Sequence, residues 1–138
     1  MPMTDQQLDD FLAEPRVAVI STVDARGRPR QAPIWYHWQD SAAYLFTSRR
    51  SLKWRNLQRD PHASLCIDDR EPPYSSILLD GAVEESNLSL YDLVLRMALA
   101  YYGEEHGRPF AEGYRDSPGT VLFKLTPERI TSFISDSY

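Results

Sequence analysis

Apolar and polar positions alternate through the first half of the chain in a pattern that predicts one short helix followed by strands. A capping box precedes an apolar stripe, which predicts a helix over residues 5–13. β-Branched residues fill positions 17–23, turn residues follow, and an extended pattern resumes over 30–38, which together predict a β-hairpin. A further strand over 43–47 would extend this hairpin into an antiparallel meander of three strands.

The same periodicity of two residues returns later in the chain and predicts four more strands. Alternating residues over 63–68 predict one strand, and residues 74–85 predict a longer one with a bulge or bend at Gly81. Apolar runs over 121–125 and 129–134 predict two closing strands around a short proline-containing turn. Strands that follow one another through short connections favour an antiparallel barrel or sandwich over a parallel sheet.

One helix is predicted between the later strands. Apolar residues recur every three or four positions after a capping residue, Ser89, and this pattern predicts an amphipathic helix that ends at Gly103. Residues 104–119 are rich in glycine, proline and charge and predict a loop with at most one helical turn. With a short helix within residues 47–59, the chain is expected to contain about seven strands and three helices.

Composition limits the classes of protein that the chain can belong to. A length of 138 residues predicts one domain over residues 1–138. The net charge of -5 argues against a nucleic-acid binder, since such proteins normally present a broad basic face. Neither a membrane span nor a signal peptide is visible, so we expect no membrane partner and a cytoplasmic protein. The single cysteine, Cys66, excludes an internal disulfide and is expected to fill apolar space in a strand.

Residues 47–59, the basic segment, hold five of the fifteen lysine and arginine residues and no acidic residue. Ser51 is placed to cap a helix whose first backbone N–H groups and dipole attract an anion. We therefore predict a phosphate site, whose expected contacts are Thr47, Ser48, Arg49, Ser51 and Lys53. The alternative is a solvated basic helix face; Arg55 and Arg59 in particular fit that reading, or could pair with Asp60 or Asp68.

A second candidate site lies in the extended segment 31–38. Pro33 cannot donate to a strand ladder, so its strand is expected at a sheet edge or distorted, with backbone groups left unpaired. Unpaired backbone beside flat side chains suits a heterocyclic ligand. For Trp35, Tyr36 and Trp38 taken one at a time, a core or dimer contact is the favoured alternative.

Motifs for metal binding and for direct catalysis by side chains are missing from the sequence. His37, His62 and His106 have no ligand spacing, and no nucleophile elbow, phosphate-binding loop or dinucleotide fingerprint is present. We therefore predict neither a metal site nor a catalytic side chain. If the protein is an enzyme, its chemistry is expected to come from a cofactor.

Four segments, in this order and spacing, resemble the split β-barrel flavoproteins related to pyridoxamine 5'-phosphate oxidase, including their deazaflavin (F420)-dependent relatives. The segments are Ala18–Pro29, Ala32–Tyr36, Tyr44–Ser48 and Lys53–Leu65. The resemblance implies a mainly β (α+β) fold, an antiparallel split β-barrel of about six to seven strands with flanking helices. It also implies a homodimer with cofactor sites at the interface, FMN or F420 as cofactor, and hydride transfer to or from a small organic substrate.

The same resemblance implies roles for particular residues. The strand 31–36 would lie along the cofactor ring, Asn56 would lie near the phosphate, and Tyr74 and Ser75 of the other subunit would close the ring pocket. The cofactor-binding residues expected in all are Gln31, Pro33, Ile34, Trp35, Tyr36, Phe46, Thr47, Ser48, Arg49, Ser51, Lys53, Asn56, Tyr74 and Ser75.

The chain also departs from the oxidases that it resembles. It ends at Ile134–Tyr138 without the longer segment whose Arg and His residues bind the vitamin phosphate, so pyridoxamine-phosphate oxidase activity itself is not expected. The basic segment looks most like the F420-binding branch, whose cofactor has an anionic tail that extra arginines could follow. The prediction is thus an FMN- or F420-dependent oxidoreductase. The alternatives are a flavin-binding protein without turnover, for storage or sensing, and a nucleic-acid module that the acidic total disfavours.

Overall fold

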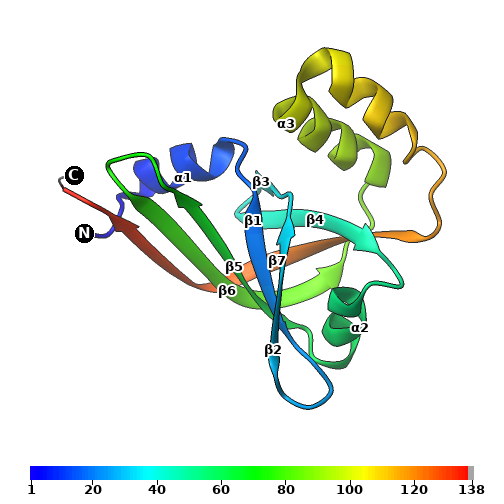
Figure 1. Ribbon diagram of the computed structural model, residues 1–138, viewed down its shortest axis with the longest axis horizontal. Coiled ribbons are helices and arrows are strands. Elements are labelled where there is room, and N and C mark those ends of the chain that lie inside the picture. Colours follow the sequence, from blue (N-terminus) through cyan, green and yellow to red (C-terminus); the bar gives the residue numbers. More distant parts are fainter. Residues whose placement is uncertain (137–138) are drawn as a thin grey trace.

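A computed structural model describes residues 1–136 and contains a curled half-barrel of seven antiparallel strands with three flanking helices (Figure 1). The fold is mainly β, α+β, as the sequence predicts. The strands are β1 (Ala18–Val23), β2 (Pro29–Ile34), β3 (His37–Gln39), β4 (Ala42–Ser48), β5 (His62–Asp69), β6 (Ser75–Glu85) and β7 (Thr120–Ile134). The helices are α1 (Asp5–Ala13), α2 (Leu52–Arg59) and α3 (Leu90–Glu112). The sheet order is β2-β1-β5-β6-β7-β4-β3.

Strand alternation puts the core on the concave face of the half-barrel. In β5 and β6 every second residue is buried, and the paired residues Leu65 and Leu79 are fully buried. Phe123 and Leu125 of β7 are buried in the same cluster. Burying such side chains contributes about 1.5–3 kcal/mol each, which fixes the register of these strands.

The extended segment predicted over 30–38 is two strands on opposite edges of the sheet. β2 pairs with β1, as the predicted hairpin requires, whereas β3 pairs with β4. The chain leaves the ladder at Trp35 and Tyr36 because Trp35 turns toward α3 and the buried Tyr36 hydroxyl donates to the Glu14 carbonyl. The predicted meander of three neighbouring strands is therefore wrong, although both of its antiparallel pairings exist.

The two closing strands predicted over 121–125 and 129–134 form one strand, β7. Its pairing with β6 shifts by one residue between Asp80 and Gly81, so that Glu128 is an extra residue on β7. This bulge accommodates the proline at 127 without ending the strand. The prediction of a bulge at Gly81 is confirmed.

Helix α3 is longer than the sequence predicts. Gly103, where the helix was expected to end, has φ 81° and joins two helical parts across a kink. The second part runs through the predicted loop because it packs on the first: a Cβ at Gly107 would lie 2.4 Å from the Ala98 carbonyl oxygen. This contact between two helical parts overrides the local Gly- and Pro-rich composition.

The predicted helix starts are confirmed. Thr4 and Gln7 form the capping box of α1, and the Ser51 hydroxyl accepts from the Trp54 backbone N–H at the start of α2. Cys66, in contrast, is exposed on the convex face of the sheet and does not fill the core. No helix within residues 1–136 is long and apolar enough to cross a membrane.

The close approach of β6 and β7 at Gly81 leads to a prediction about stability. A Cβ there would lie 2.1 Å from the Thr126 carbonyl oxygen, so Gly81→Ala must push two backbones apart. We expect a loss of about 2 kcal/mol in the free energy of unfolding, measured by urea denaturation. Gly119→Ala, with no atom within 4 Å of the added Cβ, is the control and should change stability by less than ~0.5 kcal/mol. Equal effects of the two substitutions would contradict this account.

Candidate functional site

The start of α2 brings three of the predicted phosphate contacts together. Trp54 and Leu57 face the core, and the Trp54 ring lies 5.4 Å from that of Phe123, which fixes the helix on the barrel. On the other side the Lys53 ammonium donates to the Thr47 hydroxyl at 3.3 Å, and this hydroxyl lies 3.2 Å from the Ser51 hydroxyl. Lys53 forms no ion pair with residues 1–136. Its positive charge is therefore unneutralised beside two hydroxyl groups.

A cavity of about 130 Å³ opens beside this lysine. Together with Thr47 and Ser51, we call it the Lys53 site. The cavity wall comes from β1, β2 and the start of α2, and consists of Ile20, Thr22, Arg30, Gln31, Ala32, Leu52 and Lys53. Of these, only Gln31 and Lys53 were singled out from the sequence. The hairpin register sets Arg30 opposite Thr22. The predicted hairpin could therefore have identified Arg30 as a residue of this cavity, but only with the knowledge that α2 packs on β1.

Asn56 lies beneath the Lys53 site. Its side chain is 1% exposed, and its Nδ2 donates to the Thr22 hydroxyl at 3.1 Å, while its Oδ1 accepts from Arg59. Both ends of the amide are thus used within the protein. Asn56 joins α2 to β1, which positions the cavity.

The remaining residues predicted to contact the phosphate lie away from Lys53. Arg49 forms a bidentate ion pair with Glu85, with a shortest N–O distance of 2.8 Å, and also donates to the Pro118 carbonyl. The hydrogen bonds from Arg49 lower the pKa of Glu85, so the pair stays charged at neutral pH. Phe46, Thr47 and Ser48 line another cavity, of about 310 Å³, between β4 and the loop after α3, so Thr47 borders this cavity as well as contacting Lys53.

Residues 31–36, which the resemblance places along the cofactor ring, differ from one another in their surroundings. Pro33 is exposed on β2, which is an edge strand as its proline predicts, and Ile34 is buried. Trp35 stacks on Tyr101 of α3 with ring centroids 4.7 Å apart and planes at 3°. Burial raises the pKa of the Tyr36 phenol well above its usual range, so the hydroxyl remains a donor.

Tyr74 and Ser75 lie far from α2 within one chain. Ser75 pairs with Asp69 at one end of the β5–β6 ladder, whereas Ala82 pairs with His62 close to the end of α2. Seven residues of strand separate the two ends, or about 23 Å. Figure 1 shows the same separation, with the start of β6 on the side of the two termini and α2 on the other.

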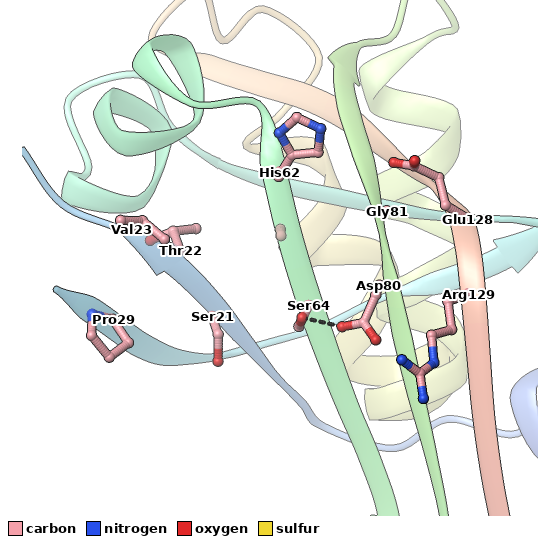
Figure 2. A pocket seen from close by; sticks show the side chains of 11 residues that line it. Ser21, Thr22, Val23, Pro29, His62, Ser64, Asp80, Gly81, Glu128 and Arg129 are labelled. Carbon is pink, nitrogen blue, oxygen red and sulfur yellow. Dashed lines mark hydrogen bonds between the residues drawn. The ribbon is translucent and has the colours of Figure 1, made fainter. Parts of the chain in front are cut away.

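A second hollow lies on the convex face of the sheet, across β1, β5, β6 and β7 (Figure 2). Its volume is about 360 Å³, and the Ser64 hydroxyl donates to the Asp80 carboxylate on its wall. Glu128 and Arg129 reach it from β7, so charges of both signs line it. None of the predicted phosphate contacts belongs to this hollow.

Comparison with known proteins identifies a family model that matches most of the chain and curated relatives that match part of it. The family model described as pyridoxamine 5'-phosphate oxidase matches residues 4–133. A pyridoxine/pyridoxamine 5'-phosphate oxidase of Acidothermus cellulolyticus is 42% identical over 56 residues, which are 41% of this chain and 25% of that protein. One of Paraburkholderia phymatum is 38% identical over 61 residues, 44% of this chain and 29% of that protein. The matched segment thus spans little more than a quarter of these curated relatives.

Solved structures share the fold at low sequence identity. A conserved hypothetical protein of Mycobacterium tuberculosis has a TM-score of 0.81 at 22% identity, covering 96% of this chain and 85% of that one. A protein described as an F420 reductase has a TM-score of 0.74 at 20% identity, covering 88% and 94%. The heme storage protein HutZ of Vibrio cholerae has 0.71 at 20% identity, covering 95% and 96%. These likenesses concern the fold alone.

The match of the family model runs through all seven strands and all three helices. The chain therefore belongs to the pyridoxamine 5'-phosphate oxidase family.

Proposed function

We propose that the Lys53 site binds the phosphate of FMN or F420 and that the protein is an oxidoreductase using this cofactor. The observation that carries the proposal is the Lys53 ammonium, which has no carboxylate partner among residues 1–136 and lies within hydrogen-bond distance of the Thr47 hydroxyl. A phosphate monoester carries about 1.5 to 2 negative charges at neutral pH and accepts several hydrogen bonds. Hydroxyl donors beside a lysine at a helix start fit such a group.

The donor set at the Lys53 site also fits the phosphate chemically. Thr47 and Ser51 offer hydroxyl groups beside Lys53, and no carboxylate or imidazole lines the cavity, while Arg30 at the cavity wall is paired with Asp24 at 3.0 Å. A cavity of about 130 Å³ accommodates a phosphate with part of its attached chain, while the ring must lie outside it. When bound, FMN or F420 supplies hydride transfer at its ring, and the protein binds and orients it.

The free edge of β2 is the position that we propose for the cofactor ring. β2 pairs with β1 on one side only, and Pro33 removes one backbone donor from that edge. The outward backbone groups of β2 are then available to the polar edge of a flavin or deazaflavin that extends from the Lys53 site. With the cofactor bound, Gln31 and Pro33 would lie along its ring, and Trp35 and Tyr36 would support this strand through α3 and the core.

The proposal includes a homodimer. Tyr74 and Ser75 lie about 23 Å along the strand from the end of α2 within one chain, so in this proposal a second copy would supply them to the site. The convex face of the sheet carries a contiguous row of apolar and small side chains that a second copy would cover. Val19, Cys66, Leu78 and Thr131 stand opposite one another across four strands, and Phe133, opposite Ser76, lies diagonal to Leu78 with Tyr74 against its ring.

The activity is tested by loading the protein with cofactor. FMN and F420 are titrated separately against the apoprotein, and the spectrum and mass of what binds identify the cofactor. The reduced holoprotein is then mixed with candidate acceptors in a stopped-flow spectrometer. Cofactor oxidation faster than that of the free reduced cofactor supports an oxidoreductase. Tight binding without accelerated oxidation by any acceptor supports storage or sensing, and binding of neither cofactor would refute the proposal.

Lys53 is the residue whose loss should matter most for cofactor binding. We expect Lys53→Ala to weaken the binding of the phosphorylated cofactor by roughly 10- to 150-fold, the equivalent of ~1.5–3 kcal/mol for a charged hydrogen bond. Fluorescence titration measures the dissociation constant. Lys124→Ala is the matched control, because Lys124, the only other lysine, pairs with Glu84 on the sheet.

Arg49 gives a second comparison within the same experiment. Because its guanidinium already pairs with Glu85, Arg49→Ala should change cofactor affinity by no more than about twofold. A large loss with Arg49→Ala and none with Lys53→Ala would show that the phosphate binds elsewhere.

The homodimer has its own test. Leu78 is 40% exposed on the convex face, so Leu78→Asp keeps a folded chain but places a charge in the proposed interface. We expect a monomer by light scattering after size exclusion, together with weaker cofactor binding. Leu88→Asp, at a similarly exposed leucine before α3, should leave the dimer intact. A Leu78→Asp variant that remains dimeric would reject this interface.

A further inference from the structure

A row of polar side chains crosses five strands on the convex face of the sheet. The strand registers set Gln31, Ser21, Ser64, Asp80 and Arg129 opposite one another in turn, from β2 through β1, β5 and β6 to β7. Gln31 Nε2 donates to the Ser21 hydroxyl at 3.3 Å, and the Ser64 hydroxyl donates to the Asp80 carboxylate. All members of the row except Gln31 line the hollow of about 360 Å³ on this face, which we call the convex hollow (Figure 2).

The bulge in β7 brings two charges of opposite sign to the convex hollow. Successive side chains of a regular strand point to opposite faces, so the neighbours Glu128 and Arg129 would normally lie on different sides of the sheet. Glu128 is the extra residue of the bulge, and both side chains line the hollow. Figure 2 shows the Glu128 carboxylate and the Arg129 guanidinium reaching away from each other. The strand thus presents an anion and a cation separately on one face.

These two charges are not neutralised within the part of the chain that the structure describes. There the side chains of Glu128 and Arg129 form no hydrogen bond or ion pair. Asp80 stands opposite Arg129 but accepts from the serine of β5 instead. The His62 ring, which also lines the hollow, contacts the Asp60 carboxylate at 2.9 Å rather than Glu128. Two carboxylates and one guanidinium are therefore available to a ligand.

The side of the convex hollow away from β7 is apolar. Val23 and Pro29 stand opposite each other in the β1–β2 hairpin and line the hollow there. Figure 2 shows the separation, with these two residues on one side and Glu128 and Arg129 on the other. A ligand that matches both sides has a head that carries both charges and an apolar body.

We propose that the convex hollow binds a small zwitterion with an apolar body, of the chemical class of the apolar α-amino acids. Its ammonium group pairs with Asp80 and Glu128, and its carboxylate pairs with the Arg129 guanidinium. Its body lies over Val23 and Pro29, where its apolar surface is removed from water.

This binding goes beyond the cofactor function proposed above, since it needs neither FMN nor F420. None of the residues expected to bind the cofactor lines the convex hollow. The row proposed as the dimer contact lies two residues away along each of β1, β5, β6 and β7. The two features of the convex face thus adjoin without sharing a residue.

Isothermal titration of the full chain with matched probes tests the proposal. L-Phenylalanine carries both charges and an apolar body, whereas 2-phenylethylamine lacks the carboxylate, 3-phenylpropionate lacks the ammonium group and glycine lacks the body. We expect L-phenylalanine to bind about tenfold tighter than each of the other three probes, because only it makes all the contacts. No binding of L-phenylalanine, or equal binding of all four probes, would overturn the proposal.

Substitutions at the two exposed positions of β7 assign the charges of the ligand. Arg129→Gln should weaken L-phenylalanine about tenfold and leave 2-phenylethylamine unchanged, since that probe has no carboxylate. Glu128→Gln should weaken L-phenylalanine and 2-phenylethylamine but not 3-phenylpropionate. Arg70→Gln is the matched control and should have no effect, because this side chain is 90% exposed and lies outside the hollow. L-Phenylalanine binding that Arg129→Gln and Glu128→Gln leave unchanged would place the ligand elsewhere and reject the site.

Discussion

The buried hydrogen bond from Asn56 to Thr22 is the interaction on which the geometry of the site depends. It joins α2 to β1 where both partners are almost fully buried, so breaking it would leave a polar group without water or partner. Trp54 and Leu57 hold the same helix on the barrel through apolar contacts. With α2 fixed in this way, Lys53 lies at the mouth of a cavity formed by the first hairpin.

As a consequence, one short helix presents its lysine and its arginine side chains on different sides. Its first turn presents Lys53 with the hydroxyl groups of Thr47 and Ser51, which suits a single compact anion. Its later turns present Arg55 and Arg59 toward the arginines of the β1–β2 hairpin. The 3.6-residue repeat of the helix turns these side chains to different sides of one short segment.

The elements of the fold follow largely from the local sequence, and the exceptions have tertiary causes. Ser51 capped the helix that its spacing predicts, and Gly81 marked the bulge. The pattern over 30–38 looked like one strand because Trp35 and Tyr36 continue the extended alternation, yet their contacts with α3 and Glu14 divide it. In the same way, Gly107 extends α3 only because it packs against Ala98, a contact invisible to local composition.

For the site, the sequence by itself determined the concentration of basic residues, the helix cap and the resemblance to a flavoprotein family. Only the tertiary structure decided which basic residues act together. It paired Arg49 with Glu85, buried Asn56 against Thr22, and set Arg30 and the hairpin arginines beside α2. The physical reason is that a sequence pattern fixes the period and ends of an element, whereas the neighbours of a side chain depend on residues distant in the chain.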